Sequence, residues 1–254
     1  MARPTVRRDG IPMTAAERKR RQRANPKKRR SENYKARKRY RASKQDTEAR
    51  RRREASRNAP PLPDGAVLRI GDCREELADI PDNSVPLILT DPPYGNAAEL
   101  LYRWLAEFAA RVLIPGGALI CYTGHTRLPR DQAILGAQLT YHHQCIVLFT
   151  QPQRLFGRNM LVSHRQVLFY TKGPSRHRSL MPDVWISPKR DKLAHVWAQG
   201  EGGVWVPIEH LTAPGELILD PFAGTGTWGR IATQMGRRWI GVDIAEGGTE
   251  TIAA

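Results

Sequence analysis

The tetrapeptide Asp91-Pro92-Pro93-Tyr94 contains the groups needed to act on an amine attached to an aromatic base. Such an amine is a poor nucleophile because its lone pair is delocalised into the ring. The Asp91 carboxylate and the Pro92 carbonyl can each accept one N–H, and acceptors off the ring plane localise that lone pair on nitrogen. Proline fixes the backbone φ angle, and Tyr94 offers a flat face for a flipped base. The alternative is an ordinary proline-rich turn after a strand.

A second segment, residues 220–227 with the sequence DPFAGTGT, has the composition of a nucleotide-binding loop. It lacks the Lys-Ser/Thr ending of a phosphate loop, which disfavours nucleoside triphosphate hydrolysis. Gly224 and Gly226 let a ligand approach the backbone closely. Asp220 can bind an ammonium group, and Asp243, after the next predicted strand, can bind two ribose hydroxyls. An ammonium and a ribose without phosphate describe S-adenosylmethionine; the alternative is a tight helix-packing turn.

The elements that position these residues alternate between apolar strands and helices. We expect strands at residues 67–70, 85–90, 118–122, 217–220 and 239–242, and helices at 74–80, 99–112 and 227–235. This alternation predicts a doubly wound, mostly parallel α/β sheet. Two further β-rich runs, 144–150 and 166–171, are expected to pair antiparallel. Ligands bind beyond the carboxyl ends of such strands, where four acidic residues lie: Asp72, Asp91, Asp220 and Asp243.

The motifs taken together resemble the amino methyltransferases of DNA, which methylate adenine N6 or cytosine N4. The resemblance covers about residues 66–245 and rests on GDC at 71–73, DPPYG at 91–95, PGGALICY at 115–122, DPFAGTGT at 220–227 and GVDI at 241–244. Because the tetrapeptide precedes the cofactor loop, the order is similar to the circularly permuted beta group of that family. The implied fold is a class I methyltransferase-like sheet that the chain enters at the third strand and leaves after the second.

The resemblance implies S-adenosyl-L-methionine as the cofactor and Asp91, Pro92, Pro93 and Tyr94 as catalytic residues. Asp72 would contact the adenine ring of the cofactor. His195 and Gln199 match a His-x-x-x-Gln element, although no Lys-Pro follows as in the common form, and His195 can instead be structural. The implied cofactor-binding residues are Asp72, Cys73, His195, Gln199, Asp220, Pro221, Phe222, Gly224, Gly226, Thr227 and Asp243.

The implied activity is methyl transfer to an exocyclic amine of a flipped base in double-stranded DNA, most simply adenine N6. The family's cytosine enzymes more often begin the tetrapeptide with serine. Cytosine N4 or an RNA base is the first alternative, and a non-catalytic DNA-binding protein on a methyltransferase scaffold is the second. A restriction-modification role in the cytoplasm of a bacterial cell or phage-infected host follows from the family alone. The sequence does not indicate monomer or dimer.

The charge of the chain is concentrated before residue 60. Residues 1–59 hold 23 of the 41 Lys and Arg residues but only 6 of the 25 Asp and Glu residues. This stretch has too few large apolar side chains to form a core. We therefore expect residues 1–64 to be a basic nucleic-acid-binding arm, disordered or helical, with a capping box at residues 14–17 and a proline-rich linker. Residues 65–254 are the predicted methyltransferase domain; the alternative for the arm is a solvated tail.

DNA contacts are expected from the arm and from two short segments of the domain. Residues 173–191 form a short predicted target-recognition region, and the loop between the two β-rich runs adds further arginines, which suit phosphates or guanine edges. The predicted DNA-binding residues are Arg20, Arg21, Lys28, Arg29, Arg39, Arg52, Arg154, Arg158, Arg176 and Arg178.

Several other classes of protein are disfavoured. No apolar run approaches the ~18 residues of a membrane helix, and no apolar stretch follows the basic N-terminus as in a secretory signal. The three cysteines Cys73, Cys121 and Cys145 show no paired spacing, so neither a disulfide framework nor a metal site is expected.

Overall fold

The computed structural model describes residues 63–94, 98–155, 158–177, 179–186 and 203–244, and six single positions before residue 40. The chain divides into two compact units, Met1–Arg52 and Arg53–Ala254. In the first unit the backbone N–H of Glu17 donates to Thr14 Oγ1 at 3.3 Å, and the Thr14 N–H donates to Glu17 Oε2 at 2.9 Å. These reciprocal bonds are those of the predicted capping box. Five predicted DNA-binding residues of this region lie outside the described residues: Arg20, Arg21, Lys28, Arg29 and Arg52.

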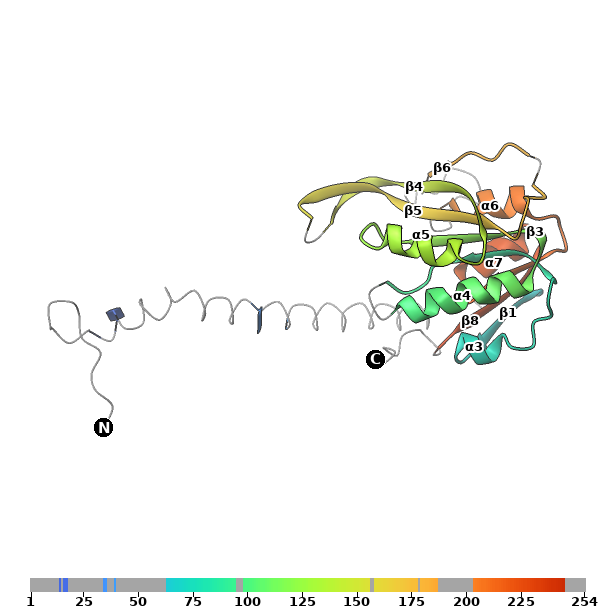
Figure 1. Ribbon diagram of the computed structural model, residues 1–254, viewed down its shortest axis with the longest axis horizontal. Helices are drawn as coiled ribbons and strands as arrows, with labels where there is room; N and C mark the ends of the chain where they lie inside the picture. The colour runs from blue at the N-terminus through green and yellow to red at the C-terminus, as the bar shows by residue number, and fades with distance from the viewer. Residues whose placement is uncertain are drawn as a thin grey trace. The chain divides into compact units, whose positions relative to one another are not determined.

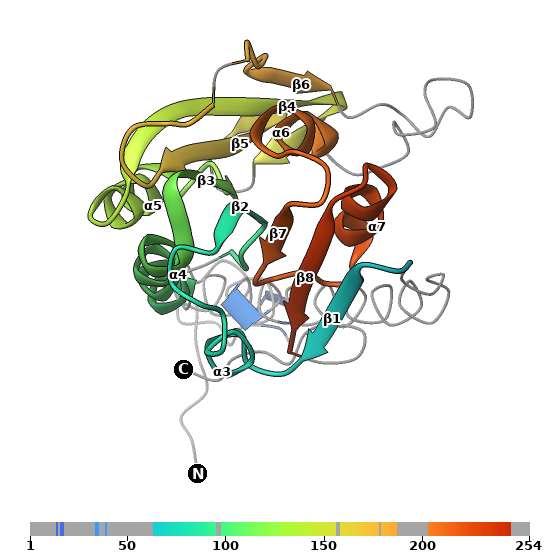
Figure 2. The same cartoon turned by 90° about the vertical axis from the view of Figure 1, so that its right-hand side faces the viewer.

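A single sheet of eight strands organises the described part of the second unit, in the order β1-β8-β7-β2-β3-β5-β4-β6 (Figure 2). The first five strands in this order are parallel, β5 is antiparallel to both β3 and β4, and β6 is parallel to β4. The expected doubly wound, permuted topology is therefore confirmed. The strands are β1 (Ala66–Ile70), β2 (Val85–Thr90), β3 (Leu113–Thr123), β4 (Thr140–Leu155), β5 (Met160–Thr171), β6 (Val184–Ile186), β7 (Leu217–Asp220) and β8 (Arg238–Asp243).

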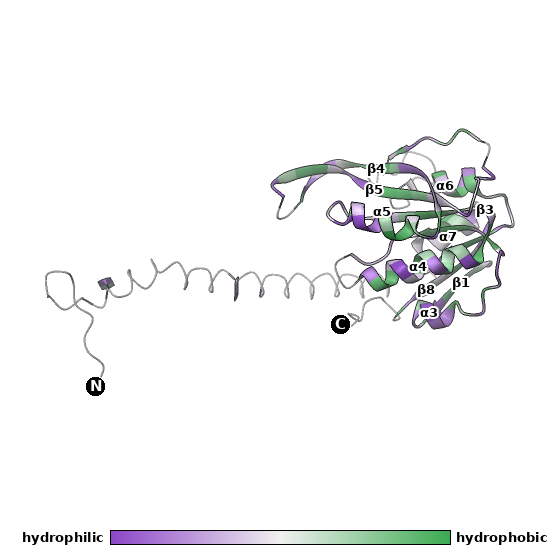
Figure 3. Cartoon of the chain, in the orientation of Figure 1, coloured by the Kyte–Doolittle hydropathy of each residue, from purple (hydrophilic) through white to green (hydrophobic). Residues whose placement is uncertain are grey.

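Helices cover both faces of the sheet (Figure 2). One buried cluster joins α4 to the sheet and contains Tyr102, Leu105 and Leu168, while the other joins α7 to the opposite face and contains Trp228 and Trp239. Figure 3 shows the resulting pattern, with apolar strands between the helices. None of the described helices is long and apolar enough to cross a membrane. The helices are α3 (Cys73–Glu76), α4 (Glu99–Val112), α5 (Leu128–Gly136), α6 (Trp205–Leu211) and α7 (Thr227–Gln234).

The sequence-based boundaries hold for the strongest apolar runs and differ elsewhere, because β3, β4 and β5 are longer than the strands expected at 118–122, 144–150 and 166–171, and α3 is shorter than the expected helix. The predicted strands at 85–90 and 217–220 and the helix at 99–112 are confirmed. The predicted helix at 74–80 is wrong in length because α3 ends at Glu76 and turns follow. Residues 115–117 lie inside β3 rather than between a helix and a strand, and Gly116 accommodates this path with a φ of +75°.

The β4–β5 hairpin continues beyond the rest of the sheet. The last pair between β3 and β5 joins Thr123 to Gln166, but β4 and β5 remain paired to Leu155 and Met160. Six further residues of β5 extend the ribbon by about 20 Å, and Figure 1 shows it projecting past α5. Because β3 ends there, the hairpin extends from the carboxyl-end edge of the parallel strands.

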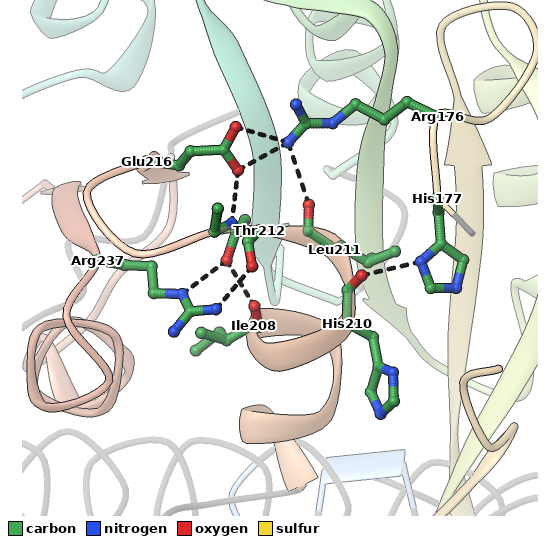
Figure 4. Close-up of polar contacts among 9 residues, drawn as sticks. Arg176, His177, Ile208, His210, Leu211, Thr212, Glu216 and Arg237 are labelled. Atoms are coloured by element: carbon green, nitrogen blue, oxygen red, sulfur yellow. Dashed lines mark hydrogen bonds and ion pairs between the residues drawn. The ribbon is translucent and has the colours of Figure 1, made fainter. Parts of the chain in front are cut away.

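At the opposite edge, a polar network joins the segment after β5 to the segments around β7 (Figure 4). Arg176 Nη2 donates to Glu216 Oε2 at 2.7 Å, and the same carboxylate oxygen accepts the Ala213 N–H at 2.8 Å. Arg237 Nη2 donates to the Thr212 carbonyl at 2.6 Å. The network therefore holds the start of β7 against the segment that follows β5.

We predict that Gly229→Ala destabilises the protein, although alanine normally favours a helix by about 1 kcal/mol. A Cβ at Gly229 in α7 would lie 2.5 Å from Trp239 Cε3, and the Trp239 ring is buried and cannot move aside. Overpacking of this kind lowers the free energy of unfolding by about 1–3 kcal/mol. Urea denaturation of the full chain measures the change.

The matched control is Gly136→Ala in the last turn of α5. A Cβ there would lie 3.7 Å from Tyr170 Cε1, an ordinary van der Waals contact, so this change is expected to be neutral or slightly stabilising. Equal stability of the two variants would contradict the described packing around Trp239.

Candidate active site

Four carboxylates lie at the carboxyl ends of four adjacent strands. Asp220 and Asp243 are the last residues of β7 and β8, Asp91 follows β2 directly, and Asp72 lies two residues after β1. These strands are neighbours in the order β1-β8-β7-β2 and are parallel. The structure therefore brings the four predicted acidic residues to one edge of the sheet, the edge where ligands bind in such folds.

Asp220 is the most deeply buried of these carboxylates, with 2% of its surface exposed. Its Oδ1 accepts hydrogen bonds from Thr90 Oγ1 at 2.7 Å and from the Phe222 N–H at 3.2 Å. The pKa of Asp220 is nevertheless raised to about 7, mainly by burial; these hydrogen bonds lower it, and the charges of Asp91 and Asp243 contribute to the rise. A bound cation would favour the ionised carboxylate.

The loop after β7 lies directly on β8. The Ala223 N–H donates to the Val242 carbonyl at 2.8 Å, and a Cβ at Gly241 would lie only 2.6 Å from the Ala223 Cβ. Gly224 and Gly226 have φ angles of +57° and +72°, which favour glycine. A Cβ at Gly224 would be 3.8 Å from Asp243 Oδ2. The loop thus presents bare backbone beside a carboxylate; Pro221 is buried behind it, and Thr227 begins α7.

Asp72 and Cys73 have structural roles at the start of α3. Asp72 is the N-cap and accepts the Arg74 N–H at 2.9 Å, and its hydrogen bonds to the Arg74 side chain lower its pKa. The Cys73 side chain lies in the core, and burial raises the pKa of its thiol to about 12. Asp72 therefore lies at the site edge with an arginine partner, whereas Cys73 contributes packing and its predicted cofactor contact has no support from this placement.

The tetrapeptide after β2 forms a compact polar cluster with a residue from β5. The Tyr94 hydroxyl donates to Asp91 Oδ1, and Arg165 Nη1 donates to Asp91 Oδ2 at 3.2 Å. Pro92 is buried and Pro93 is exposed. Tyr94 is 53% exposed, and its ring lies beside Gly124, where a Cβ would be 3.5 Å from Tyr94 Cδ1. One face of the tyrosine is therefore accessible to a planar ligand.

Arg165 is the residue of this cluster that sequence reasoning missed. Arg165 and Asp91 are 74 positions apart in the sequence, and no motif surrounds Arg165. The available signal was the predicted pairing of the β-rich run at 166–171, because Arg165 immediately precedes that run.

The other predicted site residues are dispersed or lie outside the described residues. Arg154 on β4 and Arg158 after it are exposed on the projecting hairpin. Arg176 lies at the amino-end edge in an ion pair with Glu216 (Figure 4), a placement that favours a structural role over DNA contact. Arg39 is described only as a single helical position. His195, Gln199 and Arg178 lie outside the described residues. No group of three or more His, Cys, Asp or Glu side chains in the described part could hold a metal ion.

Comparison with known proteins identifies the family. A family model described as "DNA methylase" matches residues 85–254, and this chain belongs to that family. The DNA adenine methyltransferase YhdJ of Escherichia coli K12 is 27% identical over 225 residues, which cover 68% of this chain and 76% of that protein. The chain is accordingly a DNA methyltransferase with the permuted fold that its motifs predicted.

Solved structures show the same fold. The crystal structure of M1.HpyAVI has a TM-score of 0.57 at 20% identity and covers 73% of this chain and 93% of its own. The cytosine-N4-specific PvuII DNA methyltransferase has a TM-score of 0.56 at 17% identity, and the match covers 78% of this chain and 92% of that chain. A complex of M1.HpyAVI with SAM has a TM-score of 0.55 at 22% identity, and the match covers 71% of this chain and 94% of that chain.

We predict that Asp220 makes a contribution to the stability of the ligand-free protein that is lost as the pH rises through the range from about 4 to 7, and that Asp220→Asn removes this pH-dependent contribution. Asp220 binds a proton more tightly in the folded chain than in the unfolded chain, because its folded pKa of about 7 exceeds the ordinary pKa of an aspartate. Deprotonation above the unfolded pKa therefore favours unfolding, on the order of a few kcal/mol in total.

Chemical denaturation of the unchanged protein and of Asp220→Asn between pH 4 and pH 8 gives the free energy of unfolding of each. The difference between the two curves measures the contribution of Asp220. Asparagine keeps an oxygen acceptor for Thr90 and Phe222, so the hydrogen bonds at Oδ1 are preserved. A difference curve that does not change with pH would contradict the raised pKa.

Proposed function

We propose that this chain transfers a methyl group from S-adenosylmethionine to adenine N6 in double-stranded DNA. The observation that carries the proposal is the placement of the Asp91–Tyr94 cluster at the end of β2, next to the carboxylates that end β7 and β8. Adenine is favoured because the tetrapeptide begins with aspartate and because a relative is a DNA adenine methyltransferase. Cytosine N4 is the second candidate, supported by the similar fold of a cytosine-N4-specific enzyme.

The residues beside β7 and β8 fit the cofactor. S-adenosylmethionine supplies a methyl group on a positively charged sulfur, which makes that methyl electrophilic. We assign the ribose hydroxyls to Asp243, because Gly224 leaves no side chain beside that carboxylate. We assign the ammonium group to Asp220, whose described hydrogen bonds both use Oδ1. Asp72, His195 and Gln199 complete the proposed binding residues.

The tetrapeptide would hold and activate the amine of the base. Asp91 and the Pro92 carbonyl accept its two N–H bonds, and the exposed face of Tyr94 stacks on the flipped base. As the new C–N bond forms, the bond between the methyl group and sulfur would break and leave a neutral thioether. The nitrogen would become positively charged before it loses a proton to solvent. A fixed carboxylate next to that nitrogen stabilises the developing charge more than it stabilises the neutral base, which lowers the barrier.

We predict that Asp91→Asn lowers the rate of methyl transfer by about 100-fold or more while cofactor affinity remains within a few fold. Removal of one electrostatic partner of a transition state has an effect of this size. Nucleoside mass spectrometry after incubation of DNA with labelled S-adenosylmethionine measures the rate and identifies the product, expected to be N6-methyladenine.

The matched control is Asp79→Asn, which removes a carboxylate from a solvent-exposed pair with Arg69. An Asp91→Asn variant as active as this control would contradict the mechanism. N4-methylcytosine as the product would instead select the second candidate, and the absence of product on every nucleic acid tested would favour a non-catalytic scaffold.

We also propose that the basic arm binds DNA phosphates and brings them to a domain of nearly neutral charge. If about eight phosphates are neutralised, log K falls with log salt at a slope of roughly −7. Deletion of residues 1–59 is expected to weaken DNA binding and to flatten this slope, with cofactor binding unchanged as the control for folding. Equal DNA affinity of the truncated and full chains at every salt concentration would contradict the role of the arm.

A further inference from the structure

Arg165 reaches the catalytic tetrapeptide from a strand that does not neighbour β2. It lies in β5, one residue beyond the last pair with β3, which joins Thr123 to Gln166. The guanidinium lies over the Tyr122 ring, with Cζ 5.9 Å from the ring centroid, and Nη1 donates to Asp91 Oδ2 at 3.2 Å. The side chain therefore passes over the end of β3 to contact the carboxylate.

A contribution to the stability of the fold does not explain the contact between Arg165 and Asp91. The Arg165 side chain is 41% exposed and that of Asp91 is 28% exposed, and ion pairs this accessible to water contribute little to stability. The anchor of β5 is instead its buried apolar run from Val167 to Tyr170. An arginine at this position is thus better explained by what it does to Asp91.

The two oxygens of Asp91 have different partners. Tyr94 donates to Oδ1 and Arg165 donates to Oδ2, so the carboxylate is held from both sides. A base that stacks on Tyr94 brings its own N–H donor to the same place as the tyrosine hydroxyl. Arg165 can then retain Oδ2 while Oδ1 exchanges the hydroxyl for the amine, since a carboxylate has about four acceptor positions.

The local charge also favours a cation at this place. Asp91 is close enough to Asp220 for its charge to raise the pKa of that residue, and Asp243 acts on Asp220 in the same direction. A guanidinium on Asp91 offsets part of this repulsion on the side away from β7. The guanidinium therefore offers the carboxylate a fixed positive partner beside its acidic neighbours.

We propose that Arg165 is a positioning residue for methyl transfer, which holds Oδ2 of Asp91 so that Oδ1 is presented to the target amine. This proposal rests on the proposed function of Asp91 as the acceptor for that amine. It adds a residue from the base of the β4–β5 hairpin to the machinery that the tetrapeptide forms. The rival role is contact with a DNA phosphate, which the exposure of Arg165 would also permit.

The test compares Arg165→Met and Arg165→Lys with the unchanged protein, using the full chain in single-turnover methyl transfer at saturating DNA and cofactor. Arg165→Met is expected to slow transfer by about 100-fold, because a small misplacement of a catalytic group has an effect of this size. Arg165→Lys, which can still donate to Oδ2, is expected to recover the rate to within about 10-fold. Affinities for DNA and cofactor should change less than about 3-fold.

A double variant tests whether Arg165 acts through Asp91. In the Asp91→Asn background, Arg165→Met is expected to cause little further loss, because the two changes remove the same arrangement. Lys172→Met at the other end of β5 is the control, since Lys172 bonds to Asn83 and to the Arg111 carbonyl away from the site. Its transfer rate should equal that of the unchanged protein.

Three outcomes would overturn the proposal. Full activity of Arg165→Met would show that Asp91 needs no such partner. A loss of DNA affinity with a normal rate at saturating DNA would assign Arg165 to phosphate contact. Multiplicative losses in the double variant would separate Arg165 from Asp91. An unchanged protein without any methyl transfer would instead overturn the proposed function itself, and this positioning role with it.

Discussion

Four carboxylates share one edge of the sheet, and the repulsion of Asp220 by Asp91 and Asp243 is the constraint that the rest of the site satisfies. The surroundings of three of these carboxylates differ. Asp220 is buried and its pKa rises to about 7, Asp91 pairs with Arg165 and Tyr94, and Asp72 pairs with Arg74. If the positively charged cofactor binds at this edge, as we propose, it relieves repulsion that the ligand-free protein retains.

The parallel strands make this arrangement possible, and the packing beneath them keeps it rigid. The neighbours β1 and β8 end at the same level, where Ile70 pairs with Asp243, and β7 ends two residues earlier, where Asp220 pairs with Gly241. The acidic residues therefore lie along one edge of the sheet. The buried Trp239 ring lies against Gly229 and Gly241, where no Cβ would fit. Gly241 also admits the loop after β7 to close contact with β8, so a small residue in the core sets the position of that loop.

The fold and the acidic edge could be predicted from the sequence because they depend on local patterns. The apolar run at 85–90 and the helical spacing at 99–112 specify β2 and α4 to the residue. Elements such as β6 and α6 are too short for a periodic signal, and the Pro-Gly-Gly segment at 115–117 indicated a break that strand pairing overrides.

Contacts between segments that are far apart in the sequence could not be predicted from it. Arg165 joins Asp91 only because β5 lies next to β3 in the sheet, and Arg176 meets Glu216 at the opposite edge for a similar reason. Both are arginines in a stretch without acidic residues, between Asp131 and Asp183. The sequence predicted DNA contact for Arg176 and assigned no role to Arg165. Tertiary placement separates their roles.

A crystal structure of the full chain with S-adenosylhomocysteine tests the central claim most directly, namely that the acidic edge is divided between cofactor and amine. The account predicts the ribose hydroxyls on Asp243, the amino group near Asp220, and the sulfur facing Asp91. Density for the ligand at the amino-end edge, or a sulfur directed away from Asp91, would contradict it.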